Sequence, residues 1–336
     1  TREDKAAKIS ELQCDFFIDD LWEVFAESRF PAGTKRILFR EERKEPEQVP
    51  VDLVSHSWRD ISRFLFGEER EKELKQWVIS SMSIQPRSVS RLKGRANSSV
   101  YRVKTEDDCY ALKWYPDLSK DCRERLLIEK QACEFLHSQN VHNVLQVVEA
   151  VPELNLTLFR WINGEPVTDV QDSDIGQALK FIEILHTVRC NENAVRLPQA
   201  SEACLSIEAI LKQVDQKKSK VLGAGCAPVP LNEFFEKWFN PVYRDYLAGH
   251  EEQISTLRGF GKLSRRRQIL SPSDFGFHNS LRQSNGALFW LDFEYFGWDD
   301  PVKLISDFLW HPGHSLSFSQ RKIWLEGCLE IFSEDR

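Results

Sequence analysis

Two short apolar segments near the end of the chain each lead into polar side chains of the kind that bind metals and phosphates. The segment Gln268-Ile269-Leu270 precedes Asp274, and Asn279 follows Asp274 by five positions. The apolar run 287–291 then ends on Asp292. One carboxylate can take or orient the proton of an acceptor, while an amide oxygen and a second carboxylate can hold magnesium against phosphates. The ends of two adjoining strands could therefore supply all three groups.

Each of these side chains also has a purely structural interpretation. Asp274 could accept a hydrogen bond within its own turn, and Asp292 could cap the end of a strand. Neither role explains why both carboxylates and Asn279 fall within 19 residues of one another. We therefore favour the functional interpretation.

Composition limits the classes of protein to which the chain can belong. Its 336 residues predict two or three domains, and 41% apolar residues permit large cores. A net charge of -7 argues against nucleic acid as a partner. Eight scattered cysteines, without a Cys-x-x-Cys pair, indicate reduced thiols in a cytoplasmic protein. No apolar stretch approaches about 18 residues, so we expect no membrane span.

The chain changes character twice, which predicts three zones. Residues 1–85 carry a short apolar strand, a charged stretch with prolines and a helix over 57–81. Residues 86–163 surround one helix, over 120–138, with short β-rich runs that predict a small, largely antiparallel sheet. Residues 164–336 are mostly helical, with a clear helix over 175–186. The β-rich runs are Ser99–Lys104, Cys109–Tyr115, Leu145–Ala150 and Leu156–Trp161.

The segment 92–101 runs from a strand through a small polar turn into another strand. Small side chains let backbone N–H groups approach phosphate oxygens closely. With a single glycine, an ordinary hairpin loop is the favoured interpretation of this segment taken alone. The candidate phosphate-binding residues are Gly94, Arg95, Asn97, Ser98 and Ser99.

Lys113 lies between apolar neighbours in the strand 110–115, so it needs an anionic partner if its face is buried. Glu129 could be that partner, because Leu126 and Cys133 place its carboxylate on the apolar face of its helix. Alternatively, Lys113 could extend to solvent and Glu129 could lie at the rim of the core. The two residues together favour an ion pair more strongly than either does alone.

From about residue 88, the chain carries a glycine-containing loop, a strand lysine, a helix glutamate, an Asp-x-x-x-x-Asn loop and a strand-end aspartate, in that order. With these features it resembles the aminoglycoside phosphotransferase and choline kinase-like family of small-molecule kinases. The catalytic loop of that family usually reads His-Gly-Asp, and here it is Pro272-Ser273-Asp274. Its metal-binding segment looks like Asp292, the stretch 297–301 and Asp307. Its hinge between lobes resembles 158–164, which implies that Trp161 and Ile162 contact the nucleotide.

The resemblance implies an α+β, bilobal protein kinase-like fold, with a small β-rich lobe and a large helical lobe. It also implies phosphoryl transfer from ATP or GTP, with Mg²⁺, to a hydroxyl of a small molecule such as an aminoglycoside, a sugar or a choline-like alcohol. Asp274 would be the catalytic base or orienter, and Asn279 and Asp292 would bind Mg²⁺. Lys113, held by Glu129, would contact the α- and β-phosphates.

Pro272 stands where the family has histidine. This leaves a non-catalytic, kinase-fold binding protein as the alternative, although the retained aspartates and asparagine favour an active enzyme. His278, within the catalytic loop, is the histidine that we expect to touch an acceptor. His311 and His314 have no metal-ligand partner at a recognised spacing, so we interpret them as structural. Similarly, the stretch 265–267 is expected to be a solvated turn.

Residues 1–85 show a second resemblance, to the late part of a haloacid dehalogenase-like phosphatase domain. There, paired acids such as Asp19 and Asp20 help to hold magnesium, and an earlier lysine, here Lys8, steadies a phosphate. The nucleophile motif Asp-x-Asp-x-Thr does not precede these residues. We therefore expect residues 1–85 to form a partial α/β, Rossmann-like segment without hydrolase activity. Alternatively, the chain could be the kinase half of a bifunctional phosphatase-kinase. Surface or capping acids are the favoured interpretation of the pair.

Overall fold

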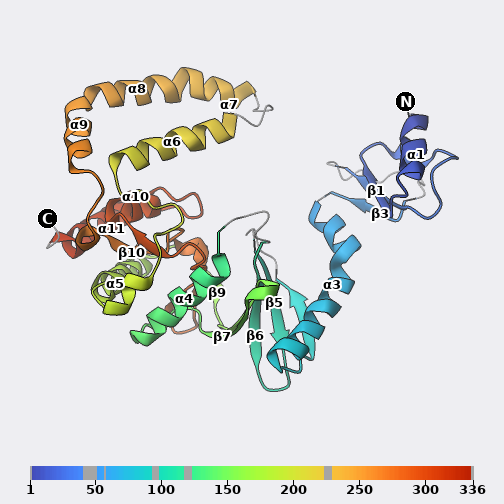
Figure 1. Cartoon of the computed structure of the whole chain (residues 1–336), viewed down its shortest axis with the longest axis horizontal. Helices are drawn as coiled ribbons and strands as arrows, with labels where there is room; N and C mark the ends of the chain where they lie inside the picture. The colour runs from blue at the N-terminus through green and yellow to red at the C-terminus, as the bar shows by residue number, and fades with distance from the viewer. Residues whose placement is uncertain are drawn as a thin grey trace. The chain divides into compact units, whose positions relative to one another are not determined.

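The computed structural model divides into two compact units, which we describe separately (Figure 1). The first comprises Thr1–Arg91 with Val103–Asp108, and the second comprises Leu92–Arg102 with Cys109–Arg336. The residues that the structure describes are 2–40, 51–56, 58–92, 98–116, 123–222 and 229–333.

The first unit begins with a small parallel α/β arrangement. Its three strands pair in the order β1-β2-β3, and every pair is parallel. Ile9, Val24, Phe25, Phe30 and Leu38 form its apolar core. The elements are α1 (Arg2–Glu11), β1 (Phe16–Asp19), α2 (Trp22–Phe25), β2 (Lys35–Phe39), β3 (Leu53–Ser55) and the long helix α3 (Trp58–Met82). The predicted α/β character of this segment is confirmed.

Asp19, one of the paired acids of the first unit, forms hydrogen bonds with neighbouring residues of that unit. Asp19 accepts hydrogen bonds from the Lys5 ammonium at 2.7 Å and from the Leu21 N–H at 3.0 Å. Lys8 pairs instead with Glu11 at 2.7 Å. The lysine next to the acids is therefore Lys5 and not Lys8, and the resemblance to a phosphatase domain stays a prediction.

A five-stranded sheet of order β4-β5-β6-β8-β7 follows along the chain. Strand β8 pairs antiparallel with both β6 and β7, as the sequence predicts. Helix α4 (Arg125–Ser138) begins later than the predicted 120, since residues 123 and 124 are not helical. The strands are β4 (Ser88–Arg91), β5 (Ser99–Lys104), β6 (Cys109–Trp114), β7 (Val147–Val151) and β8 (Leu156–Arg160).

The remainder of the second unit is mainly helical. Helices α5 and α11 pack against each other, and α9 contacts both α6 and α8. Figure 1 shows α6, α8 and α9 together on one side of this lobe. The helices are α5 (Asp172–Val188), α6 (Ile207–Leu222), α7 (Val229–Phe234), α8 (Asn240–Gly249), α9 (Glu251–Phe260), α10 (Pro301–Leu309) and α11 (Phe318–Ile331). Among the described residues, no helix is long and apolar enough to cross a membrane.

Short strands within the helical lobe carry the predicted catalytic residues. Strand β10 pairs antiparallel with β13, and a three-stranded sheet has the order β12-β11-β9. Asp274 follows the end of β10, and Asp292 follows the end of β12, as the apolar segments predict. The strands are β9 (Glu165–Pro166), β10 (Ile269–Ser271), β11 (Ser280–Arg282), β12 (Leu288–Trp290) and β13 (Gly297–Asp299).

Buried aromatic rings fix the loops beside these strands. Phe275 and Phe277 are 3% and 0% exposed, and the Phe275 ring lies 4.7 Å from that of Trp290. Phe308 and Trp324, from α10 and α11, stack at 3.9 Å on the same cluster. Full burial of each phenylalanine contributes about 1.5–3 kcal/mol, so the loop after β10 is anchored between Asp274 and His278.

The position of β13 depends on a residue without a side chain. A Cβ on Gly297 would lie 2.5 Å from the backbone of 198–200, where Trp298 exchanges hydrogen bonds with Pro198 and Ala200. We expect Gly297→Ala to destabilise the fold by about 1–3 kcal/mol through overpacking. In contrast, Gly176→Ala, in an open position on α5, should stabilise it by about 0.5–1 kcal/mol. Thermal midpoints that shift in the same direction for both variants would contradict this account.

Candidate active site

A buried lysine is the centre of the site. Lys113, in β6, is 6% exposed. Its Nζ lies 2.7 Å from Glu129 Oε2, 2.6 Å from Asp292 Oδ1 and 3.0 Å from Glu294 Oε2. Burial alone would lower the pKa of Lys113, but Asp292 and Glu129 raise it well above its usual value. The ammonium is therefore charged at neutral pH, as contact with an anion requires.

Glu129 is fixed on both of its oxygens. Oε2 accepts hydrogen bonds from Lys113 and from the Tyr115 hydroxyl at 2.6 Å, and Oε1 accepts one from the Phe293 N–H at 3.0 Å. The carboxylate is fully buried on the apolar side of α4. Burial raises the pKa of Glu129 despite the opposing effect of Lys113. The contact between these two residues that the sequence predicts is therefore present, and Glu129 holds the lysine in place.

Glu294 also belongs to this cluster, and the sequence analysis missed it. Its carboxylate forms an ion pair with Arg125 and accepts a hydrogen bond from the Ser98 hydroxyl at 3.0 Å. The available signal was the pattern Asp292-Phe293-Glu294, in which two acids flank a fully buried phenylalanine. Of the three acids around Lys113, Asp292 has the most exposed side chain, at 23%.

Two backbone positions at the site are conformationally strained. Ser273 and Asp292 have φ values of 70° and 66°, in the left-handed region that side chains with a Cβ rarely adopt. Such strain costs about 1–3 kcal/mol and is commonly found at functional sites. Both residues lie at the ends of the short apolar segments, where the sequence predicts the catalytic groups.

The Asp274 carboxylate is held by three side chains. Asn279 Nδ2 donates to its Oδ2 at 3.3 Å and to its backbone oxygen at 3.0 Å. His278 Nε2 and His311 Nε2 lie 3.2 Å and 3.0 Å from Oδ1. Burial would raise the pKa of Asp274, but the hydrogen bonds from both histidines lower it well below its usual value. His311, interpreted from the sequence as structural, thus contacts the predicted catalytic group from a position 37 residues away.

The two groups of residues are joined by the backbone. The Leu291 N–H donates to the Asn279 carbonyl at 2.9 Å, which ties the catalytic loop to the residue before Asp292. The carboxylate oxygens of Glu129, Asp292 and Glu294 lie within 4.8 Å of one another. Oxygen donors of this kind suit Mg²⁺. The most exposed of the three, Asp292, is the one best placed to reach a metal bound to phosphates.

Of the other residues predicted to contact the nucleotide, Ser98 is the one that joins the lysine cluster in the described part of the chain. Ser98 belongs to the cluster through Glu294, and Ser99 begins β5. The Trp161 ring lies 4.4 Å from the Arg102 guanidinium, and Ile162 packs against the core of the helical lobe. Gly94, Arg95 and Asn97 fall outside the described residues.

The remaining acids of the resembling metal-binding segment serve local structure. Asp299 is buried and accepts hydrogen bonds from the backbone N–H groups of Cys204 and Asp300. Asp300 caps α10 through the Val302 N–H at 2.7 Å. Asp307 pairs with Lys303 on the same helix. The turn 265–267 is exposed, as expected, and the Arg265 guanidinium lies 4.2 Å from the Trp298 ring.

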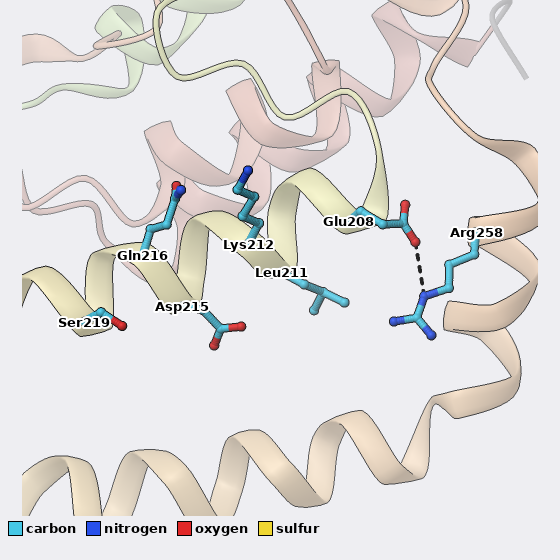
Figure 2. A pocket seen from close by; sticks show the side chains of 7 residues that line it. All are labelled: Glu208, Leu211, Lys212, Asp215, Gln216, Ser219 and Arg258. Atoms are coloured by element: carbon cyan, nitrogen blue, oxygen red, sulfur yellow. Dashed lines mark hydrogen bonds and ion pairs between the residues drawn. The ribbon is translucent and has the colours of Figure 1, made fainter.

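A groove of about 510 Å³ lies beside α6 and α9, where Arg258 pairs with Glu208 at 3.1 Å (Figure 2). Its lining shares no residue with the lysine cluster. The groove is therefore separate from the lysine cluster. The groove is lined by Glu208, Leu211, Lys212, Asp215, Gln216, Ser219 and Arg258.

Comparison with solved structures shows which fold carries this site. A spectinomycin phosphotransferase in complex with ADP and spectinomycin has a TM-score of 0.54 at 13% identity, covering 76% of this chain and 79% of its own. An ADP-bound aminoglycoside phosphotransferase has a TM-score of 0.52 at 16% identity, covering 80% and 84%. The chain has the aminoglycoside phosphotransferase fold. Plasmodium vivax ethanolamine kinase shares this fold, with a TM-score of 0.51 at 15% identity, covering 84% of this chain and 82% of its own.

This result confirms the predicted bilobal, kinase-like architecture of the sheet-rich and helical lobes. No protein-family model matches the chain, and no curated protein matches it in sequence. The aminoglycoside phosphotransferase fold is therefore recognised in this chain through its structure and through the residues at its site.

Asp299 should make stability depend on pH. Its burial raises the pKa from 3.8 to about 6, so the folded state holds this proton more tightly than the unfolded state. Stability should therefore fall as pH rises from about 4 to about 6, by about 2 kcal/mol. Asp299→Asn should abolish that fall, whereas Asp107→Asn, in an exposed turn, should retain it. Equal pH profiles of the thermal midpoint for both variants would disprove the assignment.

Proposed function

We propose that the protein transfers a phosphoryl group from ATP or GTP to a hydroxyl of a small molecule, with Mg²⁺. The observation that carries this proposal is the Lys113 ammonium, held between Glu129 and Asp292 at 2.7 Å and 2.6 Å. The loop that bears Asp274 and Asn279 is held beside Asp292, because the Leu291 N–H donates a hydrogen bond to the Asn279 carbonyl. Phosphoryl transfer requires mainly positioning and charge stabilisation, which these groups can provide.

Nucleotide binding would begin at the lysine. Lys113 is charged and buried, so its ammonium would present a compact positive charge to the α- and β-phosphates. Asp292 and the Asn279 amide oxygen would hold Mg²⁺. A bound Mg²⁺ would neutralise part of the negative charge of the phosphates. Glu129 would keep the lysine in position while Asp292 turns to the metal. ADP is bound in two of the similar structures, which is compatible with this role.

Asp274 would orient the acceptor. Because its pKa is held low, its carboxylate is ionised at neutral pH and binds a substrate hydroxyl as a hydrogen-bond acceptor. A weak base suffices, since the transition state for phosphoryl transfer is loose and the hydroxyl proton leaves late. The acceptor itself is an alcohol, of which aminoglycosides, sugars and choline-like compounds are the candidates. A screen of these compounds coupled to ADP release would identify the class.

A non-catalytic binding protein is the second candidate, and Pro272 is the observation that favours it. Pro272 is buried at the position of the family histidine, and its carbonyl accepts a hydrogen bond from the Asp274 N–H at 2.9 Å. Thermal-shift measurements with and without Mg-ATP address nucleotide binding. Nucleotide-dependent stabilisation without turnover on any acceptor would favour this candidate.

Substitutions at the two aspartates separate orientation from metal binding. Asp274→Asn should lower kcat by at least about 100-fold, with little change in the KM for ATP, because it removes only the group that orients the acceptor. Asp292→Asn should abolish Mg²⁺-dependent turnover. Asp169→Asn, at an exposed position, is the control and should behave as the parent enzyme. Unchanged turnover of Asp274→Asn would show that the catalytic assignment is wrong.

A further inference from the structure

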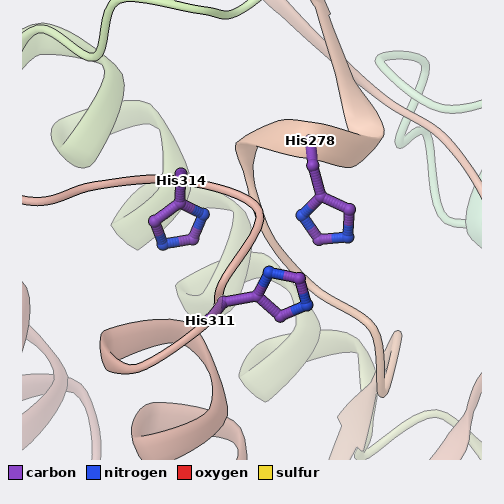
Figure 3. Close-up of side chains that lie close together, drawn as sticks. All are labelled: His278, His311 and His314. Atoms are coloured by element: carbon purple, nitrogen blue, oxygen red, sulfur yellow. The ribbon is translucent and has the colours of Figure 1, made fainter. Parts of the chain in front are cut away.

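Three histidines from two loops meet beside Asp274. His278 lies on the turn that follows β10, while His311 and His314 lie in the loop that follows α10. One ring nitrogen from each lies within 4.8 Å of those of the other two. The rings of His278 and His311 are parallel, with centroids 4.0 Å apart. Figure 3 shows the three rings facing one another.

The Nε2 atom of every ring is already engaged. His278 Nε2 and His311 Nε2 both lie near Asp274 Oδ1, at 3.2 Å and 3.0 Å, and His314 Nε2 lies 2.9 Å from the Phe308 carbonyl. A carboxylate and a carbonyl only accept hydrogen bonds, so each Nε2 carries the hydrogen and each neutral ring has its lone pair on Nδ1. Histidines that bind metals are held in this way, with the other nitrogen donating to a carboxylate or carbonyl.

In the view of Figure 3, the Nδ1 edge of each ring is turned toward the space between the three histidines. His314 Nδ1 is buried and has no hydrogen-bond partner within the described part of the chain. A buried acceptor without a partner costs about 1–3 kcal/mol, which a ligand at this point would offset. His311 Nδ1 accepts a hydrogen bond from the Gly313 N–H at 2.9 Å, and a metal would take over that lone pair.

Two glycines leave space around this centre. A Cβ on Gly276 would lie 2.7 Å from His278 Nδ1, and a Cβ on Gly313 would lie 2.9 Å from His311 Nδ1. Any larger residue at either position would occupy the edge of the rings at which the lone pairs lie. The backbone on both sides is therefore close to the histidines, and the Gly313 N–H is the backbone group that a metal at His311 Nδ1 would displace.

We propose that His278, His311 and His314 bind a divalent transition-metal cation of the zinc class through their Nδ1 atoms. Imidazole donors suit such cations, whereas Mg²⁺ prefers the oxygen donors around Asp292. Three protein ligands leave a fourth position of a tetrahedral cation for water or another ligand. Because two of the ligands donate to Asp274, occupancy of this site is coupled to that carboxylate.

The test is Zn²⁺ binding to the full chain without an affinity tag, in excess Mg²⁺ and without nucleotide or acceptor. Equilibrium dialysis followed by metal quantification should find one equivalent of Zn²⁺. Loss of a group that hydrogen-bonds to a metal ligand lowers metal affinity by about 10–100-fold. Loss of a ligand itself costs more, so His278→Gln and His314→Gln should each weaken Zn²⁺ binding by more than about 100-fold. Asp274→Asn removes such a partner and should fall within that smaller range. Since no turnover is measured, failure here is independent of the proposed phosphotransferase.

Another pair of histidines provides the matched control. His137 and His142 approach each other at 3.3 Å between Nδ1 atoms but have no third histidine beside them, so His142→Gln should leave Zn²⁺ binding unchanged. Circular dichroism establishes that each variant is folded, and His278 is the most exposed of the three ligands. Absence of Zn²⁺ binding by the parent chain would overturn the proposal. Retention by folded His278→Gln and His314→Gln would also do so, and would point to thiols such as the exposed Cys190.

Discussion

The burial of the Lys113 ammonium is the interaction on which the site depends. A buried charge without partners is strongly unfavourable, so the sheet-rich lobe and the loop after β12 must bring carboxylates to it. Glu129, Asp292 and Glu294 meet that need, and Arg125 neutralises part of the excess. Among the residues that the structure describes, three carboxylates thus face two cationic side chains, which is a formal excess of one negative charge. A cation at Asp292 would remove this imbalance, which is a physical reason for the cluster to attract Mg²⁺ when nucleotide binds.

The catalytic loop is organised by different forces. Phe275 and Phe277 anchor it in an aromatic core. Its polar residues are therefore held on a rigid support, although the loop contains little helix or strand. Pro272 cannot provide the hydrogen bonds of a histidine side chain. Here, His311 from the loop after α10 contacts Asp274 instead. Asp274 is thus held by His278 and Asn279 from its own loop and by His311 from a distant segment.

This difference explains what the sequence could and could not predict. Strand β5 and the contact between Lys113 and Glu129 were predictable, because periodicity and the cost of a buried lysine act over short stretches of chain. Glu294 and Arg125 are 169 positions apart, and no local pattern connects them. The histidine cluster was missed for the same reason, since spacing rules for metal ligands detect neighbours on one helix or loop. The contacts of the loop around Gly94 stay a prediction.

In the proposed mechanism, the orientation of the Asn279 amide would link the metal to the acceptor. Its Nδ2 donates to both Asp274 Oδ2 and the Asp274 carbonyl, and these oxygens only accept, so the nitrogen and oxygen of the amide are unambiguously placed. The amide oxygen is then turned away from Asp274 and is available to a cation. An aspartate at this position would set two carboxylates against each other and would lose the donor. In the proposed mechanism, an asparagine at this position can both donate a hydrogen bond to Asp274 and offer an oxygen to Mg²⁺, whereas an aspartate cannot donate.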